Sequence, residues 1–248
     1  MADLNSGHRW GHGLSAFMPF YNEQGNIRRV AADCVAALER LVEDWELILV
    51  NDGSRDDTGP LADELASGDP RIRAVHHQVN RGYGAALQSG FRAARKEYVF
   101  YTDGDGQFDV NQLDRLLPLG QRYDIVSGYR LDRREHAVRR LNAWAWGQLV
   151  QKLLRFKCRD VDSAFKLYRR VIFEHIDMQS TGALIDAEIL ARACRAGFTL
   201  GEVGVNHRPR LAGTSTGGNL RVILRAFREL CRLRKDILAT APASRSAP

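Results

Sequence analysis

The sequence predicts an α/β fold in which a mostly parallel central sheet is flanked by helices and followed by a basic amphipathic C-terminal helix. Three observations support this prediction. Short apolar runs alternate with helical patterns through the first half of the chain, polar clusters follow three of those runs, and the last helical pattern is both basic and amphipathic.

The predicted elements alternate between strand and helix. Apolar runs of strand length are separated by stretches in which apolar residues recur every three or four positions. Because consecutive parallel strands are joined by a helical crossover, this alternation predicts a parallel sheet. The expected strands are 14–20, 46–50, 72–76, 98–102 and 125–128, and the expected helices are 26–42, 59–66, 84–95, 110–117, 138–156 and 219–238.

We expect one large domain with loose ends, since 248 residues can form a single large domain. Residues 1–13 are small and polar, which predicts a flexible leader. Residues 239–248 are rich in Ala, Pro and Ser, which predicts a loose tail. The folded part then divides into an α/β domain at 14–216 and an amphipathic helix at 217–238.

The composition excludes several protein classes. Apolar residues make up 44% and charged residues 27% of the chain, which is typical of globular domains. The four cysteines are widely spaced and form no Cys-x-x-Cys pair, so we expect free thiols in a reducing cytoplasm rather than a disulfide framework or a zinc site. No stretch approaches the roughly 18 to 20 apolar residues that a membrane span needs, so any membrane contact is expected to be peripheral.

The net charge of +6 hides a division between the two halves of the chain. Residues 1–124 carry 13 basic and 19 acidic side chains, whereas residues 125–248 carry 23 basic and 11 acidic ones. We therefore expect the halves to contact different partners. Nucleic acid is not expected among them, because the acidic half would repel a phosphate backbone and the sequence carries no helix-turn-helix, zinc finger or RNA-binding signature.

Polar, acidic segments follow three of the predicted strands, at 19–23, 51–54 and 103–107. The carboxyl ends of parallel strands share one edge of a sheet, and ligands of such sheets bind outside that edge. Asp103 and Asp105, separated by one glycine, would repel each other there. A divalent cation relieves such repulsion, so the pair predicts a metal site.

Magnesium or manganese suits this site, because both ions prefer hard oxygen ligands and also hold substrate phosphates. Gln107 could supply a further neutral oxygen. A solvated Asp-Gly turn without metal is the alternative. A third carboxylate, Asp52, follows a neighbouring strand and weakens that alternative.

The segment Asn80-Arg-Gly82-Tyr-Gly84 opens the third predicted helix and superficially resembles a dinucleotide-binding fingerprint. Leu87 occupies the third glycine position, and the segment follows the third strand rather than the first, so that interpretation fails. A helix N-terminus with small residues still suits a phosphate or a sugar hydroxyl, and a plain helix-start turn is an equally good interpretation.

Five motifs occur in the order seen in inverting family 2 glycosyltransferases of the GT-A fold. The chain most resembles the polyprenol-phosphate glycosyltransferases, the group that includes dolichol-phosphate mannose synthase, from about Ser15 to Arg225. The resemblance implies that 14–216 is a GT-A domain. The motifs are Pro19-x-x-Asn22-Glu23, Val50-Asn-Asp-Gly-Ser54, Asn80-x-Gly82, Asp103-x-Asp105-x-Gln107 and Asp162-Ser163-x-Phe165-Lys166.

The resemblance also implies an activity and a set of site residues. The activity would be metal-dependent inverting transfer of a hexose, mannose or glucose, from a GDP- or UDP-sugar to polyprenyl phosphate, with the metal as Lewis acid and template. Asp105, Asp162 and Arg210 would be the catalytic residues. The nucleotide sugar would contact Pro19, Tyr21, Glu23, Asp52, Asn80, Gly82, Asp103 and Arg130, and Asp103, Asp105 and Gln107 would hold Mg²⁺ or Mn²⁺.

Arginine-rich segments in the second half predict phosphate contacts. A guanidinium fork suits bidentate phosphate recognition, and Arg130 and Arg134 follow the fifth predicted strand. Arg210 and Ser215 lie in a segment that resembles the Arg-x-x-Gly-x-Ser motif of the family, which implies contact with the donor diphosphate and the acceptor phosphate. For Arg208, a solvated basic loop is the preferred interpretation.

The acceptor class stays open. A phosphate monoester has its second pKa near 6, so it is already a nucleophile at neutral pH, whereas a hydroxyl acceptor needs a general base. Asp162 is the best single acceptor-side carboxylate, although it could instead orient Lys166 or an arginine. Asp160, Asp186 and Glu188 are also available. The alternatives are a family 2 enzyme that glycosylates a saccharide, protein or small-molecule hydroxyl, and a non-catalytic module that binds a nucleotide sugar or a lipid head group.

The last predicted helix, 219–238, carries six basic residues against two acidic ones, and its apolar residues form one broad face. Such a helix can lie on an anionic membrane surface, or it can pack its apolar stripe on the domain. The helix 138–156, with Trp144 and Trp146, offers the same two interpretations. We expect a peripheral location on the cytoplasmic face of a membrane, where a separate membrane protein could be a partner.

Overall fold

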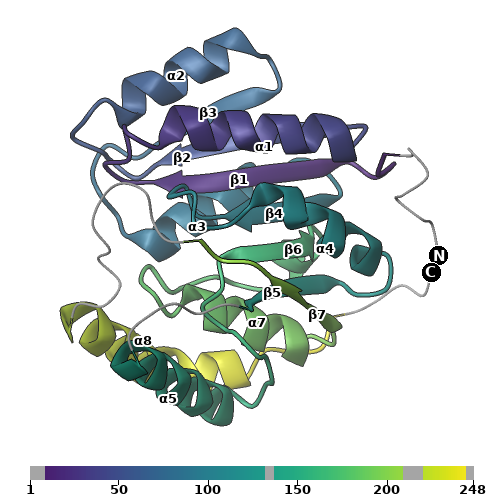
Figure 1. Ribbon diagram of the computed structural model, residues 1–248. Coiled ribbons are helices and arrows are strands. Elements are labelled where there is room, and N and C mark those ends of the chain that lie inside the picture. The colour runs from purple at the N-terminus through teal and green to yellow at the C-terminus, as the bar shows by residue number, and fades with distance from the viewer. Residues whose placement is uncertain (1–8, 132–136, 209–219, 244–248) are drawn as a thin grey trace.

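The computed structural model contains a seven-stranded sheet with helices on both faces (Figure 1). It describes residues 9–131, 137–208 and 220–243, and in the first turns of two helices, at 137–142 and 220–223, it describes the backbone alone. The leader residues 1–8 and the tail residues 244–248 therefore lie outside the described chain.

The sheet has the order β3-β2-β1-β4-β6-β5-β7. β6 runs antiparallel to both β4 and β5, and the other neighbouring strands pair in parallel. The strands are β1 (Leu14–Phe20), β2 (Trp45–Asn51), β3 (Ile72–His76), β4 (Tyr98–Thr102), β5 (Ile125–Arg130), β6 (Phe165–Arg169) and β7 (Leu200–Val205).

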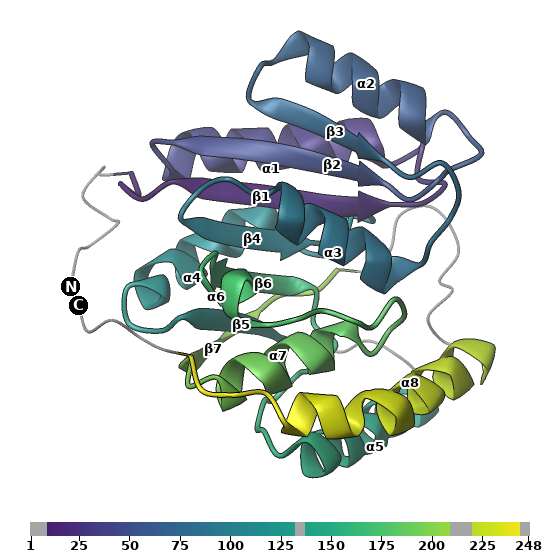
Figure 2. The same ribbon diagram turned by 180° about the vertical axis from the view of Figure 1, so that it is seen from behind.

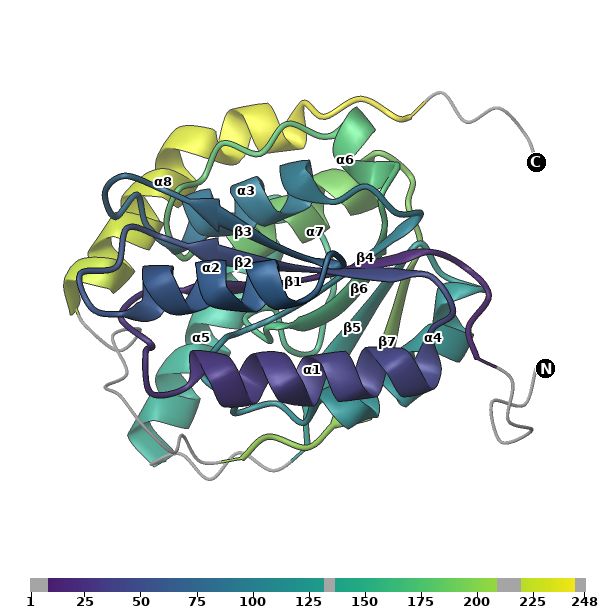
Figure 3. The same ribbon diagram turned by 90° about the horizontal axis from the view of Figure 1, so that it is seen from above.

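Helices cover both faces of the sheet, with α1 and α4 on one face and α3 and α7 on the other (Figures 2 and 3). α5 and α8 lie side by side beyond the β7 end. The helical elements are α1 (Ile27–Leu41), α2 (Thr58–Gly68), α3 (Tyr83–Ala93), the 3₁₀ turn η2 (Val110–Gln112), α4 (Leu113–Gly120), α5 (Ala137–Leu154), α6 (Ile172–His175), α7 (Ile185–Arg195) and α8 (Leu220–Leu238).

The core lies on both sides of the central strands. Every residue of β2 and β4 is buried, because helices cover both faces, and strands in that position are continuous apolar runs. On the α3 face the ring of Phe91 packs edge-on against Phe17 and Tyr168, at centroid distances of 4.8 and 5.5 Å. The predicted mostly parallel α/β architecture is confirmed.

The packed part extends beyond the predicted boundaries at both ends. Trp10, which we assigned to a flexible leader, is 3% exposed, and its backbone N–H donates to Leu41 at 2.7 Å. Ala243, which we assigned to a loose tail, donates its N–H to Ala196 at 2.9 Å and packs on the core. The indole of Trp10 packs on the Tyr98 ring at a centroid distance of 5.4 Å, and this burial of apolar surface outweighs the polar character of the neighbouring residues.

Candidate active site

The segments after β1 and β2 are joined at the carboxyl edge of the sheet. The backbone N–H of Asn22 donates to Ser54 Oγ at 3.0 Å, and Asn22 Oδ1 accepts from the N–H of Arg55 at 2.8 Å. The N–H of Glu23 donates to Thr58 Oγ1 at 2.8 Å. These bonds hold two of the three predicted polar segments together.

The three residues of the first segment that are predicted to bind the nucleotide sugar lie along this edge. Pro19 is half-buried near the end of β1, and Tyr21 is 42% exposed. The carboxylate of Glu23 accepts from Asn26 Nδ2 at 2.6 Å, which orients it at the start of α1. An exposed aromatic ring beside an oriented carboxylate is an arrangement that suits a flat, hydrogen-bonding ligand.

Asp52 is 3% exposed, and its carboxylate shapes the turn before α3. Oδ1 lies 2.6 Å from His77 Nδ1 and accepts from the N–H of Arg81 at 2.8 Å, while Oδ2 accepts from the N–H of Gly82 at 2.9 Å. Asn80, which is exposed, also donates from its side chain to the Asp52 carbonyl at 3.3 Å. Asp52 therefore fixes the backbone around Asn80 and Gly82, which are also predicted to contact the nucleotide sugar.

Only glycine fits at position 82. Its φ is +99°, and a Cβ there would lie 2.7 Å from the carbonyl oxygen of Thr181. The N–H of Gly84 donates to that same carbonyl at 3.1 Å. The start of α3 is thereby held against the segment before α7.

The turn after β4 carries the predicted metal ligands. Gly104 between the two aspartates is required by close packing, because a Cβ there would lie 2.3 Å from the Phe20 ring. The N–H of Gln107 donates to Asp105 Oδ1 at 3.0 Å, and Gln107 Nε2 donates to the Arg208 carbonyl at 3.2 Å. The amide oxygen of Gln107 thus stays on the side away from that carbonyl.

Burial, together with the nearby carboxylates Asp105 and Asp186, raises the pKa of Asp103 to about 7. The hydroxyl of Tyr83 donates to Asp103 Oδ1 at 3.1 Å and opposes this rise. A carboxylate whose charged form is disfavoured by its neighbours is a place where a cation is stabilising.

The turn after β4 fits a divalent cation that shares its coordination with a substrate. Asp103 and Asp105 offer carboxylates and Gln107 an amide oxygen, and Mg²⁺ commonly takes one or two carboxylates and completes its shell with substrate phosphates. Within residues 9–131, 137–208 and 220–243, no group of three or more His, Cys, Asp or Glu side chains is arranged to hold a metal.

Arg130, predicted to contact the donor, forms a fork with Asp160. Nε donates to Oδ2 at 2.7 Å and Nη2 to Oδ1 at 2.8 Å, and the side chains are 12% and 8% exposed. This planar two-bond geometry is the strongest form of the arginine–carboxylate pair. It fixes the end of β5 against the segment that precedes β6.

Asp186 and Glu188 are also buried and paired. Asp186 contacts the Lys166 ammonium at 2.7 Å and accepts from the Tyr101 hydroxyl. Glu188 accepts from Arg192 Nε at 2.9 Å and from two backbone N–H groups in the segment before α7. Neither carboxylate opens to solvent.

Asp162 differs from the other three acceptor-side carboxylates, all of which the structure describes, because its side chain is exposed. Surrounding protein and the carboxylates Asp186 and Asp160 raise its pKa to about 6, while Arg130 and Lys166 oppose the rise.

The remaining predicted phosphate contacts, Arg134, Arg210 and Ser215, lie outside the described residues. Arg208, predicted to be solvated, is exposed and pairs with Asp109 at 2.5 Å. Tyr83 and Tyr101 belong to the site but were not predicted from the sequence. The only feature of the sequence that could have pointed to these two tyrosines is their position, since each lies within three residues of a predicted site residue.

The sequence profile of glycosyl transferase family 2 matches residues 15–177, a span that includes the segments after β1, β2 and β4. The chain belongs to this family.

Relatives of this family 2 glycosyltransferase include the glycosyltransferase AglD of Haloferax volcanii, which is 34% identical over 79% of the chain. An undecaprenyl-phosphate 4-deoxy-4-formamido-L-arabinose transferase of Pectobacterium carotovorum is 31% identical over 85%. A polyprenol monophosphomannose synthase of Mycolicibacterium smegmatis is 30% identical over 82%. The chain spans 33%, 64% and 81% of the lengths of these three proteins.

Solved structures share the fold. Glucosyl-3-phosphoglycerate synthase from Mycobacterium tuberculosis, in complex with Mn²⁺, UDP-glucose and phosphoglyceric acid, superposes with a TM-score of 0.68 at 19% identity. The match covers 94% of this chain and 81% of the synthase. The GT-A architecture implied by the motifs is therefore confirmed for this family 2 glycosyltransferase.

Proposed function

We propose that the protein catalyses inverting transfer of a hexose, mannose or glucose, from a GDP- or UDP-sugar to polyprenyl phosphate, with a divalent metal ion. The observation that carries this proposal is that three of the four acceptor-side carboxylates are buried in ion pairs. The names of the Pectobacterium and Mycolicibacterium relatives, which refer to undecaprenyl phosphate and polyprenol monophosphate, support it.

Most of the acceptor-side carboxylates already have partners within the protein. Asp160, Asp186 and Glu188 are buried and each lies against a cation, so their oxygens are engaged in ion pairs and are not open to an acceptor. A hydroxyl acceptor must lose a proton as it attacks, whereas a phosphate monoester is largely ionised at neutral pH. A site whose carboxylates are mostly held in ion pairs therefore suits an acceptor that brings its own negative charge.

The donor would lie across the segments after β1 and β2. Pro19, Tyr21 and Glu23 are proposed to contact the base and ribose, with Asp52 holding Asn80 and Gly82 in place beside them. In-line attack on the anomeric carbon from the side opposite the leaving diphosphate inverts the configuration.

The leaving diphosphate would lie at the turn after β4, where Asp103, Asp105 and Gln107 are proposed to hold Mg²⁺ or Mn²⁺. A bound ion of this kind supplies Lewis acidity and neutralises charge that develops on the leaving group. Tyr83 orients Asp103 through its hydroxyl. The Mn²⁺ and UDP-glucose bound by the Mycobacterium synthase support this proposal.

Five further residues complete the proposed site. Arg210 and Ser215, with Arg134, are assigned to the diphosphate and the acceptor phosphate, and Arg130 to the donor side through its fork with Asp160. Asp162 faces the acceptor and, with Asp105 and Arg210, forms the proposed catalytic set.

A polyprenyl phosphate acceptor lies in a membrane, so we propose that the protein binds an anionic membrane surface peripherally, on its cytoplasmic face. α8 packs one stripe on the domain, through Ala226, Leu230 and Leu233, but leaves Leu224 and Phe227 about half exposed among arginines. Exposed apolar side chains flanked by basic ones are typical of helices that bind anionic lipid surfaces.

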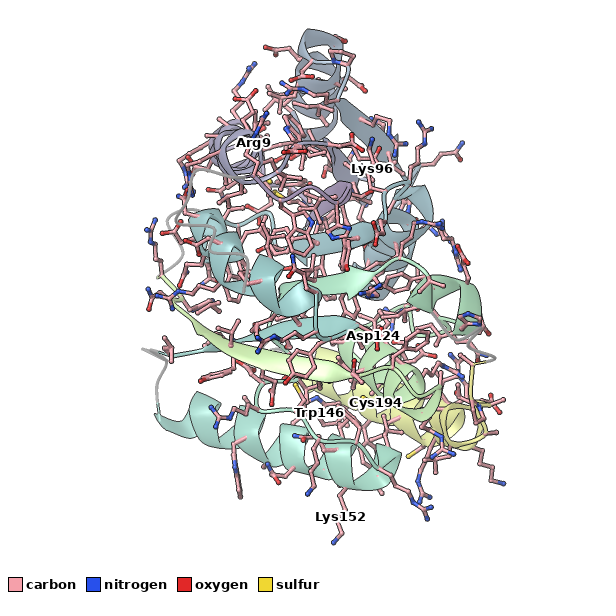
Figure 4. All side chains as sticks on the ribbon, turned by 90° about the vertical axis from the view of Figure 1, so that its right-hand side faces the viewer. Arg9, Lys96, Asp124, Trp146, Lys152 and Cys194 are labelled. Atoms are coloured by element: carbon pink, nitrogen blue, oxygen red, sulfur yellow. The ribbon has the colours of Figure 1, made fainter. Side chains whose placement is uncertain are left out.

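α5 has the same two-sided character. Trp146 lies toward the domain, Lys152 extends away from it, and Trp144 is 61% exposed (Figure 4). Within the described residues, no helix is both long and apolar enough to cross a membrane. A separate membrane protein is a further proposed partner.

A second function is favoured by one observation. Asp162 is exposed and its pKa of about 6 lies in the range that suits a general base, so transfer to a saccharide, protein or small-molecule hydroxyl is the alternative. A non-catalytic nucleotide-sugar binding module is a third candidate.

The test is a transfer assay with radiolabelled GDP-mannose and UDP-glucose, with undecaprenyl phosphate or octyl glucoside as acceptor, and with Mn²⁺ or EDTA. We expect label in undecaprenyl phosphate only, and only with Mn²⁺. Asp105→Asn should abolish transfer, and Asp44→Asn, at the opposite edge of the sheet, is the matched control. Label only in octyl glucoside would reject the acceptor class, and binding of donor without any transfer would indicate a binding module.

A further inference from the structure

Lys166 lies within the sheet, where an ammonium group is rare. It is the second residue of β6, and its exposure is 0%. Because β6 pairs with two strands, Lys166 stands opposite Tyr101 of β4 on one side and Ser127 of β5 on the other. Removing an ammonium group from water is costly unless it is paired. The partners of Lys166 therefore indicate its role.

Two of those partners are backbone carbonyls in the segment before β6. Nζ donates to the carbonyl oxygen of Val161 at 3.0 Å and to that of Ser163. These residues flank Asp162, the exposed acceptor-side carboxylate. Two hydrogen bonds from one buried group fix the backbone on both sides of Asp162.

The other partners lie on β4 and α7. Nζ contacts Asp186 Oδ1 at 2.7 Å and the Tyr101 hydroxyl at 3.2 Å, and that hydroxyl donates to Asp186. Tyr101 lies on β4, two residues before Asp103, which belongs to the turn after that strand. Lys166 thus connects the backbone around Asp162 with the strand that ends at the turn after β4.

We propose that Lys166 is a positioning residue, which holds the segment around Asp162 at a fixed place relative to the turn after β4 and so aligns the acceptor with the donor. The inference rests on the proposed function, in which Asp162 faces the acceptor. Lys166 itself is too deeply buried to touch substrate. Its effect should therefore fall on the acceptor and not on the donor.

A purely structural role predicts different behaviour. Replacing a buried ion pair by neutral residues of similar volume is often harmless to stability. If Lys166 only filled the sheet, such a replacement would restore function together with the fold. If Lys166 positions the acceptor segment, the neutral replacement would fold but would still lack the two bonds to Val161 and Ser163.

The test compares Lys166→Met/Asp186→Asn with Asp186→Asn alone. Methionine fills the volume of the lysine stem, and asparagine keeps an acceptor for Tyr101. The single variant keeps Lys166 on both carbonyls, so it controls for the loss of Asp186. A second matched control is Arg73→Met/Glu46→Gln, which removes a partly buried ion pair joined at 2.8 Å at the opposite edge of the sheet.

Two readouts are measured at a temperature at which all variants are folded. The first is steady-state transfer from the preferred sugar nucleotide to undecaprenyl phosphate. We expect the double variant at Lys166 to raise the KM for undecaprenyl phosphate about tenfold or more relative to Asp186→Asn, because small misplacements in a site are costly, with the donor KM changed less than about twofold. The second is hydrogen exchange of residues 157–164, which should become faster in the double variant alone.

Either readout can overturn the inference. An acceptor KM equal to that of Asp186→Asn, or equal rises in both KM values, would leave Lys166 a structural residue. If the wild-type protein transfers no sugar to undecaprenyl phosphate, the proposed function fails, and the inference is then decided by exchange alone. Unchanged exchange of residues 157–164 would refute it in that case too.

Discussion

Replacing Asp52 by Asn should destabilise the protein even though asparagine has almost the same shape. Three donors converge on the buried carboxylate: His77, and the N–H groups of Arg81 and Gly82. Asparagine offers only one acceptor oxygen. Its NH₂ group would take the place of the other carboxylate oxygen and would face a hydrogen-bond donor. One partly buried N–H then loses its partner, which costs about 1–3 kcal/mol.

The companion variant Asp52→Ala removes all three acceptor contacts. The expected loss is about 3–6 kcal/mol, which is a large part of the stability of a typical domain. Urea unfolding of wild type, Asp52→Asn and Asp52→Ala at pH 7 measures both differences. Asp63→Asn is the matched control, because Asp63 is exposed and contacts His76 on the surface at 3.0 Å.

The donor should also bind less well to Asp52→Asn, since the turn at Asn80 and Gly82 is held by the lost bonds. Isothermal titration with the preferred sugar nucleotide measures this. An unfolding free energy for Asp52→Asn within about 0.5 kcal/mol of wild type would refute the reasoning, because surface substitutions alone cause changes of that size. A normal stability with lost donor binding would instead make Asp52 a direct ligand.

Three further predictions concern other parts of the molecule. Gly104→Ala should lower the unfolding free energy by about 1–3 kcal/mol, because its Cβ would lie 2.3 Å from the Phe20 ring, and a thermal melt like that of wild type would contradict this. Leu224→Ser/Phe227→Ser should weaken sedimentation with anionic vesicles at unchanged melting temperature, and equal sedimentation would remove α8 from the membrane contact. The pKa of Asp162, about 6, lies above that of an aspartate in the unfolded chain. Between about pH 4 and 6 the folded protein therefore keeps Asp162 protonated while the unfolded chain does not. Above that window the charged Asp162 side chain disfavours folding. The stability of Asp162→Asn relative to wild type should therefore be greatest at pH 7 and shrink as the pH falls to 4, and urea unfolding that shows the opposite trend would reject the raised pKa.

The first five strands and the helices between them could be predicted to within a few residues, because short apolar segments alternate with stretches in which apolar residues recur every three or four positions. β6 and β7 were not predicted. β6 has Lys166 near its start, which interrupts the apolar pattern, and β7 contains two glycines and Glu202. Both strands owe their place to pairing with distant strands, which leaves little local signal.

The edge of the site could be predicted from sequence, because Asp52 and Asp103 each follow a strand and parallel strands end together. The pairings could not. Arg130 was assigned to the donor from its position after a strand, but its fork with Asp160 joins residues 30 positions apart. A side chain's partner is set by tertiary packing, and the sequence gives only its chemical type.

The most direct test of the central claim is the pH dependence of kcat/KM for undecaprenyl phosphate in wild type and in Asp162→Asn. If the acceptor brings its own charge, the asparagine variant keeps a rate that rises through the second ionisation of the phosphate, near pH 6, with a loss below about tenfold. If Asp162 must take a proton from the acceptor, that rise disappears and the rate falls about 100-fold or more, which would contradict the account.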